Sequence, residues 1–225
     1  MAKQTHKDYE HIVVDGGSTD RTLEIIQKQN AYKAKILEKK IEGIYAALNH
    51  GIVNSNGKII GILHGDDQFM QNDVLQQVNE EFKDPTVMVV YGDLEYVDPK
   101  NNRVTRRWKV GENKRKKWLW GWSIPHTTTF IRREVFDHFG YYLEHYKIAG
   151  DYDFLLRVCY QQNLKSVYLP KTLVRMNKGG ISNVSFKNRM IGIMESMKVL
   201  KSFQLKTYPI AFILKPLRKF AQFIQ

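Results

Sequence analysis

The chain has 225 residues, of which 43% are hydrophobic and 12% aromatic, so it can fold around a substantial core and is not disordered. Its single cysteine, Cys159, excludes an intramolecular disulfide framework and a multi-cysteine zinc site. The formal net charge of +12 calls for an anionic partner: nucleic acid, a membrane surface or a phosphorylated ligand. No secretory signal and no apolar run of about 18 residues is visible, which predicts a cytoplasmic protein.

Two short strand–helix patterns open the chain. Residues 11–14 predict a strand that ends at Asp15, and a helix begins near residue 21. Gly16 and Gly17 permit a tight turn between them, and Ser18 or Thr19 can cap the helix. Asp15 then stands at the carboxyl end of a strand, where an acidic residue can bind a ribose hydroxyl or a base N–H. The alternative is an ordinary packing turn.

The second pattern leads to the most informative stretch of the sequence. A weak strand over residues 34–37 and a helix over 44–52 precede an apolar run from residue 59, which stops at Asp66 and Asp67. Two adjacent carboxylates repel each other unless a cation or a proton intervenes. Mg²⁺ is held in this way, by one or two carboxylates together with substrate phosphates. The alternative is a solvated turn after a buried strand.

The positive charge is concentrated in residues 103–117, which carry eight basic side chains and one acidic one, Glu112. Trp118, Trp120 and Trp122 follow directly. No helix-turn-helix, zinc-finger or aromatic-strand pattern accompanies the charge, which disfavours nucleic acid as the partner. Tryptophan beside lysine suits a membrane interface, and the alternative is a solvated basic loop with its tryptophans packed in the core.

Residues 13–20, 43–52 and 63–67 together resemble, in order and spacing, the family 2 glycosyltransferases, which are inverting, nucleotide-sugar-dependent enzymes of the GT-A fold. The resemblance implies an α/β fold with a Rossmann-like, mostly parallel sheet flanked by helices and followed by C-terminal amphipathic helices. Residues 1–185 would form the transferase domain, and residues 186–225 a basic helical tail suited to a membrane interface. Relatives open with one further strand and helix, so the resemblance also implies that these are missing here.

The resemblance assigns roles on the donor side of the site. Asp15, Gly17, Ser18 and Asp66 resemble the residues that bind the nucleotide sugar. Asp66 and Asp67 resemble the motif that binds Mg²⁺ or Mn²⁺ across the diphosphate, and the motif leaves open which of the two is the direct ligand.

On the acceptor side, Asp151 resembles the general base that deprotonates the acceptor hydroxyl, and capping of the following helix is the alternative. His126 is expected to contact the acceptor or the donor phosphate. Three departures from the family pattern stand out: His64 and Ala46 replace acidic or amide residues, and Gly150 replaces a glutamate beside the base.

The implied function is transfer of a sugar, with inversion, from a nucleotide diphosphate sugar such as a UDP-hexose to an acceptor hydroxyl in surface polysaccharide or glycolipid assembly. The acceptor would be lipid-linked or a saccharide, and the basic tail would contact the anionic inner face of the plasma membrane. The alternative is a truncated, non-catalytic remnant that binds a membrane or a partner. Two further expectations are a glycine-rich lid at residues 178–182 and an interfacial helix at 208–225.

Overall fold

We describe the protein from a computed structural model, which covers residues 1–28, 34–177 and 185–205. The expected lid at residues 178–182 and the expected interfacial helix at 208–225 lie outside the described residues. The elements, in chain order, are β1 (Ile12–Asp15), α1 (Thr22–Lys28), β2 (Lys35–Glu38), α2 (Ile44–Val53), β3 (Ile59–Gly61), β4 (Asp67–Phe69), α3 (Val74–Glu81), β5 (Val89–Val97), β6 (Val104–Trp108), α4 (Arg115–Trp118), the 3₁₀ turn η1 (His126–Thr128), β7 (Thr129–Arg132), α5 (Arg133–Phe139), α6 (Gly150–Leu155), the π-helical turn η2 (Leu156–Gln161), β8 (Ser166–Asn177) and α7 (Phe186–Ser202).

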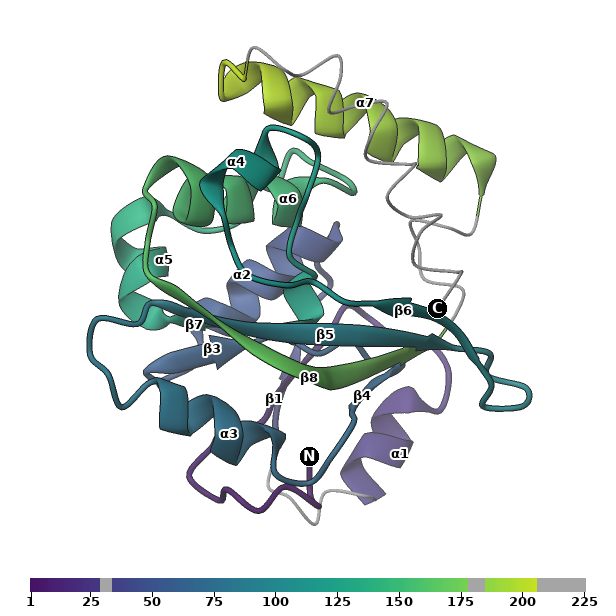
Figure 1. Cartoon of the computed structure of the whole chain (residues 1–225). Helices are drawn as coiled ribbons and strands as arrows, with labels where there is room; N and C mark the ends of the chain where they lie inside the picture. The colour runs from purple at the N-terminus through teal and green to yellow at the C-terminus, as the bar shows by residue number, and fades with distance from the viewer. Residues whose placement is uncertain (29–33, 178–184, 206–225) are drawn as a thin grey trace.

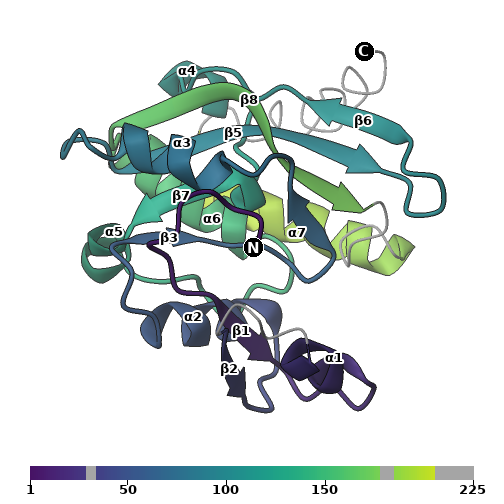
Figure 2. The same cartoon turned by 90° about the horizontal axis from the view of Figure 1, so that it is seen from below.

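The strands form two sheets. β1 and β2 pair in parallel as a two-stranded sheet, and a six-stranded sheet has the order β3-β7-β5-β8-β4, with β6 beside β5. In Figure 2 the small sheet lies with α1 and α2 at one side of the larger one. The α/β class is therefore confirmed.

The expectation of a mostly parallel sheet needs correction, because the larger sheet is mixed. β7 lies between β3 and β5 and runs antiparallel to both, so that β3, β5 and β8 share one direction. β4 and β6 run the other way, since the chain turns back after β3 and again after β5. The sequence pattern showed which segments are apolar but not the direction in which each strand enters the sheet.

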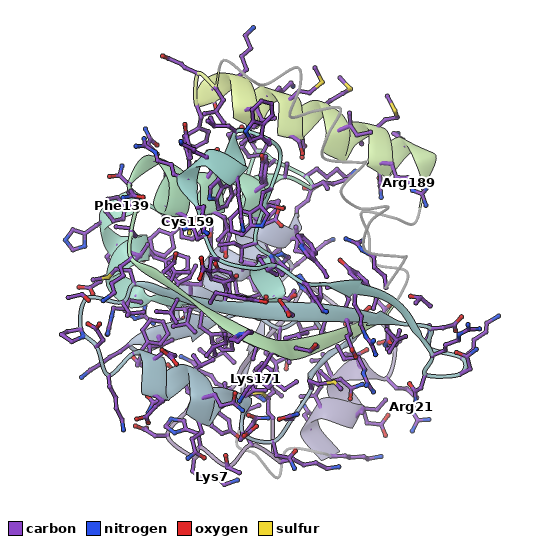
Figure 3. All side chains as sticks on the ribbon, in the orientation of Figure 1. Lys7, Arg21, Phe139, Cys159, Lys171 and Arg189 are labelled. Atoms are coloured by element: carbon purple, nitrogen blue, oxygen red, sulfur yellow. The ribbon has the colours of Figure 1, made fainter. Side chains whose placement is uncertain are left out.

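Helices cover both faces of the larger sheet. α3 packs on one face through Val74 and Val78, while α2, α5 and α6 pack on the other, and α7 lies outside α6 (Figure 1). Trp118 and Trp122 are buried in the core beside Cys159, which Figure 3 labels in the interior. Trp120 remains 41% exposed, and the basic stretch contributes the strand β6 to the sheet. The expected basic loop is thus partly a strand, with two of its following tryptophans in the core.

α7 is anchored to the segment that precedes α6. The carboxylate of Glu195 accepts hydrogen bonds from the backbone N–H groups of Lys147, Ile148 and Ala149, at 2.8, 2.8 and 2.9 Å. Val199 and Leu200, one turn further along α7, are fully buried. α7 therefore holds in place the backbone that leads directly to Asp151. Within the described ranges, no helix is long and apolar enough to cross a membrane.

Candidate active site at the edge of the sheet

Asp67 is the first residue of β4, and the chain reaches it through a tight turn in which its N–H donates to the carbonyl of His64 at 3.0 Å. Its side chain is 9% exposed, and neither carboxylate oxygen has a hydrogen-bond partner among the described residues. Burial, together with the charge of neighbouring Asp66, raises the pKa of Asp67 to about 7. Asp66 itself is exposed. An unpartnered buried carboxylate is costly and calls for a ligand.

A divalent cation fits this pair of carboxylates. Both oxygens of Asp67 are available, Asp66 stands next to it, and carboxylate oxygen is the donor that Mg²⁺ and Mn²⁺ prefer. Among the described residues, no group of three or more His, Cys, Asp or Glu side chains is placed to hold an ion by itself. The protein would therefore supply part of the ligand shell, and phosphate oxygens of a substrate the rest.

Two histidines connect this region to Asp151. His64 and His126 approach each other at 2.8 Å between their Nε2 atoms, so one ring donates and the other accepts. The Nδ1 atom of His126 lies 3.1 Å from Oδ2 of Asp151. Burial, followed by the charge of His126, lowers the pKa of His64 to about 4. His64 is thus neutral at physiological pH and supports His126 from the side opposite Asp151.

Tyr45, from the first turn of α2, reaches Asp151 from another direction. Its hydroxyl lies 2.6 Å from the carbonyl oxygen of Ile148 and 3.1 Å from Oδ1 of Asp151. Burial and the negative charge of Asp151 raise the pKa of Tyr45, so the phenol stays protonated and donates. Asp151 is therefore contacted by Tyr45 on one oxygen and by His126 on the other.

Asp151 does not cap α6. The N-cap position belongs to Ala149, and no side chain in the described part of the chain caps the helix. The side chain of Asp151 is 27% exposed and that of His126 is 20% exposed, so solvent and a substrate can reach both. A carboxylate that is partly exposed and held by fixed donors can accept a proton from a hydroxyl group. This arrangement favours the catalytic interpretation of Asp151 over the capping alternative.

The loop after β1 is built around Asp15. One oxygen of this buried carboxylate accepts from the N–H groups of Gly17 and Ser18, at 3.0 and 2.9 Å, and the other accepts from the hydroxyl of Ser18. These bonds, those from Ser18 above all, lower the pKa of Asp15. Gly17 has a positive φ of 105°, which favours glycine. Its neighbour Gly16 lies beside the carbonyl of Ile41, in the segment that leads into α2 and Tyr45.

The structure therefore brings together His126, Asp151 and the Asp66–Asp67 pair, but it does not join Asp15 to them by any contact among the described residues. Asp15 shapes its own loop, with Gly17 and Ser18 as its partners.

Sequence reasoning missed Tyr45, Tyr96 and Glu195. Burial raises the pKa of Tyr96, the charge of Arg106 opposes this rise, and the charges of Asp67 and Asp151 add to it. No sequence motif marks these three residues, since each depends on a tertiary contact with a distant segment.

Comparisons with known proteins show which family and which fold the chain shares. Residues 1–140 match the family model described as Glycosyl transferase family 2. A PGL/p-HBAD biosynthesis glycosyltransferase of Mycobacterium bovis (strain BCG / Pasteur 1173P2) is 30% identical over 190 residues, which cover 81% of this chain and 71% of that protein. A chondroitin synthase of Pasteurella multocida (strain Pm70) is 31% identical over 160 residues, which are 69% of this chain and 16% of the synthase.

Solved structures show the same fold. S. aureus TarS (residues 1–349) in complex with UDP-GlcNAc has a TM-score of 0.64 at 20% identity, over 88% of this chain and 60% of that one. The mannosyltransferase PcManGT from Pyrobaculum calidifontis, in complex with GDP-Man and Mn²⁺, has a TM-score of 0.63 at 16% identity, over 93% of this chain and 61% of that one. The chain thus spans about three fifths of these solved chains.

The fold, together with the family match and the relatives, defines the class of a nucleotide-sugar glycosyltransferase with a GT-A fold. More specifically, the chain belongs to glycosyl transferase family 2.

Proposed function

We propose that this protein transfers a hexose from a UDP-sugar, with the help of Mg²⁺ or Mn²⁺, to a hydroxyl of a lipid-linked or saccharide acceptor in surface polysaccharide or glycolipid assembly. One observation carries the proposal. A buried carboxylate without partners, Asp67, lies in one cluster with a partly exposed carboxylate, Asp151, that fixed donors hold in place. The UDP-GlcNAc complex of TarS supports the choice of UDP.

On the donor side, Asp67 would be the direct ligand of the cation, because its two oxygens are buried and unpartnered, with exposed Asp66 as the second carboxylate. When bound, the cation would neutralise the charge that develops on the leaving nucleoside diphosphate. The loop of Asp15, Gly17 and Ser18 would contact the nucleoside of the same donor.

On the acceptor side, Asp151 would accept the proton of the attacking hydroxyl. A sugar hydroxyl is a poor nucleophile at neutral pH, so a base within hydrogen-bond reach is needed. His126, between Asp151 and His64, would orient the carboxylate and face the acceptor or the donor phosphate. A single displacement on the face opposite the diphosphate inverts the anomeric centre.

The test is a screen of nucleotide sugars with and without Mn²⁺, on the wild type and on Asp151→Asn. We expect the variant to bind UDP and Mn²⁺ as the wild type does while sugar transfer falls by about 10²–10⁴-fold. Glu134→Gln, which changes an exposed carboxylate on α5, is the matched control and should leave transfer unchanged. Equal transfer by Asp151→Asn would remove Asp151 from the role of base. A wild type that binds nucleotide but transfers nothing would favour the non-catalytic alternative.

We also propose that residues 1–185 carry the transferase activity and that residues 186–225 bring it to the inner face of the plasma membrane. The outer side of α7 supports this proposal: Met190 and Met194 are 42% and 55% exposed, and Lys187, Lys198 and Lys201 are exposed. Figure 3 shows sulfur-bearing side chains standing out from this side of the helix. Exposed apolar groups beside cations suit an anionic interface. Removal of residues 208–225 should lower binding to anionic vesicles. Unchanged binding would show that this segment does not contribute to membrane binding.

A further inference from the structure

The ring of Tyr45 is fixed in place beside the backbone that leads to Asp151. Tyr45 lies in the first turn of α2, is 5% exposed, and has its ring centre 5.8 Å from that of Tyr142. One turn later on the same side of α2, Asn49 binds the backbone of Tyr142: its Nδ2 donates to the carbonyl at 2.9 Å, and its Oδ1 accepts from the N–H at 3.1 Å. α2 and α6 cover the same face of the larger sheet (Figure 1). A buried ring held in this way leaves the hydroxyl hydrogen as the part of Tyr45 that can turn.

The hydroxyl of Tyr45 faces two acceptors. Its oxygen lies 2.6 Å from the carbonyl oxygen of Ile148 and 3.1 Å from Oδ1 of Asp151. A phenol has one proton to donate, which turns towards the better acceptor, and its oxygen can also accept a hydrogen bond. The carbonyl is neutral at every pH, whereas the carboxyl group of Asp151 is negative before it accepts a proton and neutral afterwards. The preferred acceptor of the Tyr45 proton therefore depends on whether Asp151 is charged.

Tyr45 can serve Asp151 in both of these states. Burial and the negative charge of Asp151 raise the pKa of Tyr45, so the phenol keeps its proton throughout. While Asp151 is a carboxylate, that proton points to Oδ1, because a hydrogen bond to a charged acceptor is roughly twice as strong as one to a neutral carbonyl. After Asp151 has accepted a proton, the phenol turns its own proton to the carbonyl of Ile148, and its oxygen can accept a hydrogen bond from the new O–H. His126 contacts the other oxygen, Oδ2, at 3.1 Å and takes no part in this exchange.

We propose that Tyr45 is a positioning residue for the base: its hydroxyl donates to Oδ1 of charged Asp151 and to the carbonyl of Ile148 once Asp151 is protonated, which keeps the carboxyl group in one orientation during proton transfer. The inference rests on the proposed transferase function and adds a residue to its acceptor side. Because Tyr45 is buried, it acts through Asp151 and does not bind the donor. Its loss should therefore lower the rate of transfer rather than the affinity for UDP.

Other titratable groups also surround Asp151 and have to stay the same in a test. His126, from η1, contacts Oδ2 of the carboxyl group. Burial raises the pKa of Tyr142 and of Tyr96, and the charge of Asp151 adds to both rises. Replacing the phenol of Tyr45 by a phenyl ring leaves these three groups in the protein, so a change in the pH dependence of transfer reports the lost hydroxyl.

Tyr45→Phe in the full chain tests the proposal, because it removes the hydroxyl and keeps the buried ring. Tyr91→Phe is the matched control, since the hydroxyl of buried Tyr91 donates at 3.0 Å to a backbone carbonyl in the loop after β6, that of Gly111. We expect kcat for sugar transfer to fall about tenfold or more in Tyr45→Phe, with the affinity for UDP and Mn²⁺ within about twofold of the wild type. The acidic limb of its kcat–pH profile should move to higher pH, because a carboxylate that has lost a donor is protonated more readily.

An unmoved acidic limb in Tyr45→Phe, or an equal loss of kcat in Tyr91→Phe, would overturn the proposal, because a merely structural role predicts both. Weaker UDP binding in Tyr45→Phe alone would assign the residue to the donor side instead. If Tyr45→Phe fails to fold, replacement of Tyr45 by 3-fluorotyrosine keeps the hydroxyl and makes it a stronger donor; the acidic limb must then move to lower pH, and an unmoved limb overturns the proposal. If the wild type transfers no sugar, the transferase proposal fails by itself. A ¹³C NMR titration of the Asp151 carboxyl group then decides on Tyr45, since its midpoint must still rise in Tyr45→Phe.

Discussion

The ring of Tyr45 lies against the backbone of Gly150. A Cβ atom at position 150 would come within 2.8–2.9 Å of three atoms of that ring, well inside the contact distance of two carbons. The tyrosine can therefore pass over this position and place its hydroxyl near Asp151 only because residue 150 has no side chain. This contact gives a physical reason for glycine at a position where the family resemblance leads one to expect glutamate.

Gly150→Ala should consequently displace Tyr45 from Asp151. Overpacking of this kind typically costs about 1–3 kcal/mol of stability, which urea denaturation measures. Gly65→Ala is the control, because a Cβ there meets nothing within 4 Å. A smaller side chain at position 45, Tyr45→Leu, should restore part of the stability when combined with Gly150→Ala, since the two changes share one contact. Wild-type stability in Gly150→Ala alone would contradict the steric argument.

Much of the fold follows from local pattern. The short apolar run ending at Asp15 and the helical spacing over residues 44–52 correspond to β1 and α2. The apolar run from residue 59 is a strand only at its start, because β3 ends at Gly61 and Asp67 is the first residue of β4. β6 was missed because the polar and basic side chains of residues 103–107 obscure its strand pattern. The mixed sheet was missed because strand direction depends on long connections rather than on local sequence.

The candidate site also contains residues that sequence motifs predict and residues that only the folded structure reveals. Asp67, His126 and Asp151 come from motifs, and the structure places them in one cluster. Tyr45 and Glu195 lie far from Asp151 in the sequence and contact its surroundings only after folding, so no local signal identifies them.

The stability of the metal-free protein should depend on pH through Asp67. Its pKa of about 7 in the folded protein exceeds the ordinary 3.8, so the folded state binds more protons between these values. Stability therefore falls as pH rises from about 4 to 7, by up to roughly 4 kcal/mol, and levels off above pH 7. Asp67→Asn should remove this decline. Denaturation curves of the wild type and of Asp67→Asn at pH 5, 6 and 7 measure this decline. If the free energy of unfolding falls equally with pH in both proteins, Asp67 is not its cause.

Metal affinity should distinguish Asp67 from Asp66. Asp67 is buried with both oxygens unpartnered, whereas Asp66 is exposed, so we expect Asp67→Asn to weaken Mn²⁺ binding in the presence of UDP more than Asp66→Asn does, by about tenfold or more. Because a carboxylate must be deprotonated to bind a cation, wild-type affinity should also rise up to pH 7. Calorimetry in buffers of different ionisation enthalpy counts the released protons. A larger loss in Asp66→Asn would reverse the assignment of the direct ligand.

Glu195→Gln should slow sugar transfer without affecting the donor site. The carboxylate fixes three N–H groups immediately before α6, and a carboxamide offers only one acceptor oxygen to them. We expect a loss of about 1–3 kcal/mol in stability and a lower kcat, with UDP affinity unchanged. Lys198→Gln, on the exposed side of the same helix, is the control. If kcat in Glu195→Gln equals that of the wild type, the segment before Asp151 does not need this anchor.

The outer side of α7 predicts selective binding to anionic membranes. Glu195 is the only acidic residue of α7, and its carboxylate bonds to the backbone before α6, so the exposed positions of the helix carry methionine, lysine, arginine and the terminal Ser202. Replacing both Met190 and Met194 by serine should weaken binding to phosphatidylglycerol vesicles by about tenfold, since each methionine contributes apolar area to the interface.

Val53→Ser is the matched control for this experiment, because Val53 is 63% exposed on α2, away from α7. Added salt should weaken binding in the wild type and in both variants, since the lysines of α7 attract the anionic headgroups. Vesicle co-sedimentation measures these effects. An equal loss in Val53→Ser would show that the place of the methionines on α7 does not determine the affinity for vesicles. Equal binding to neutral phosphatidylcholine vesicles would show that the charge of α7 does not determine it. Either result would mean that α7 does not form the membrane contact.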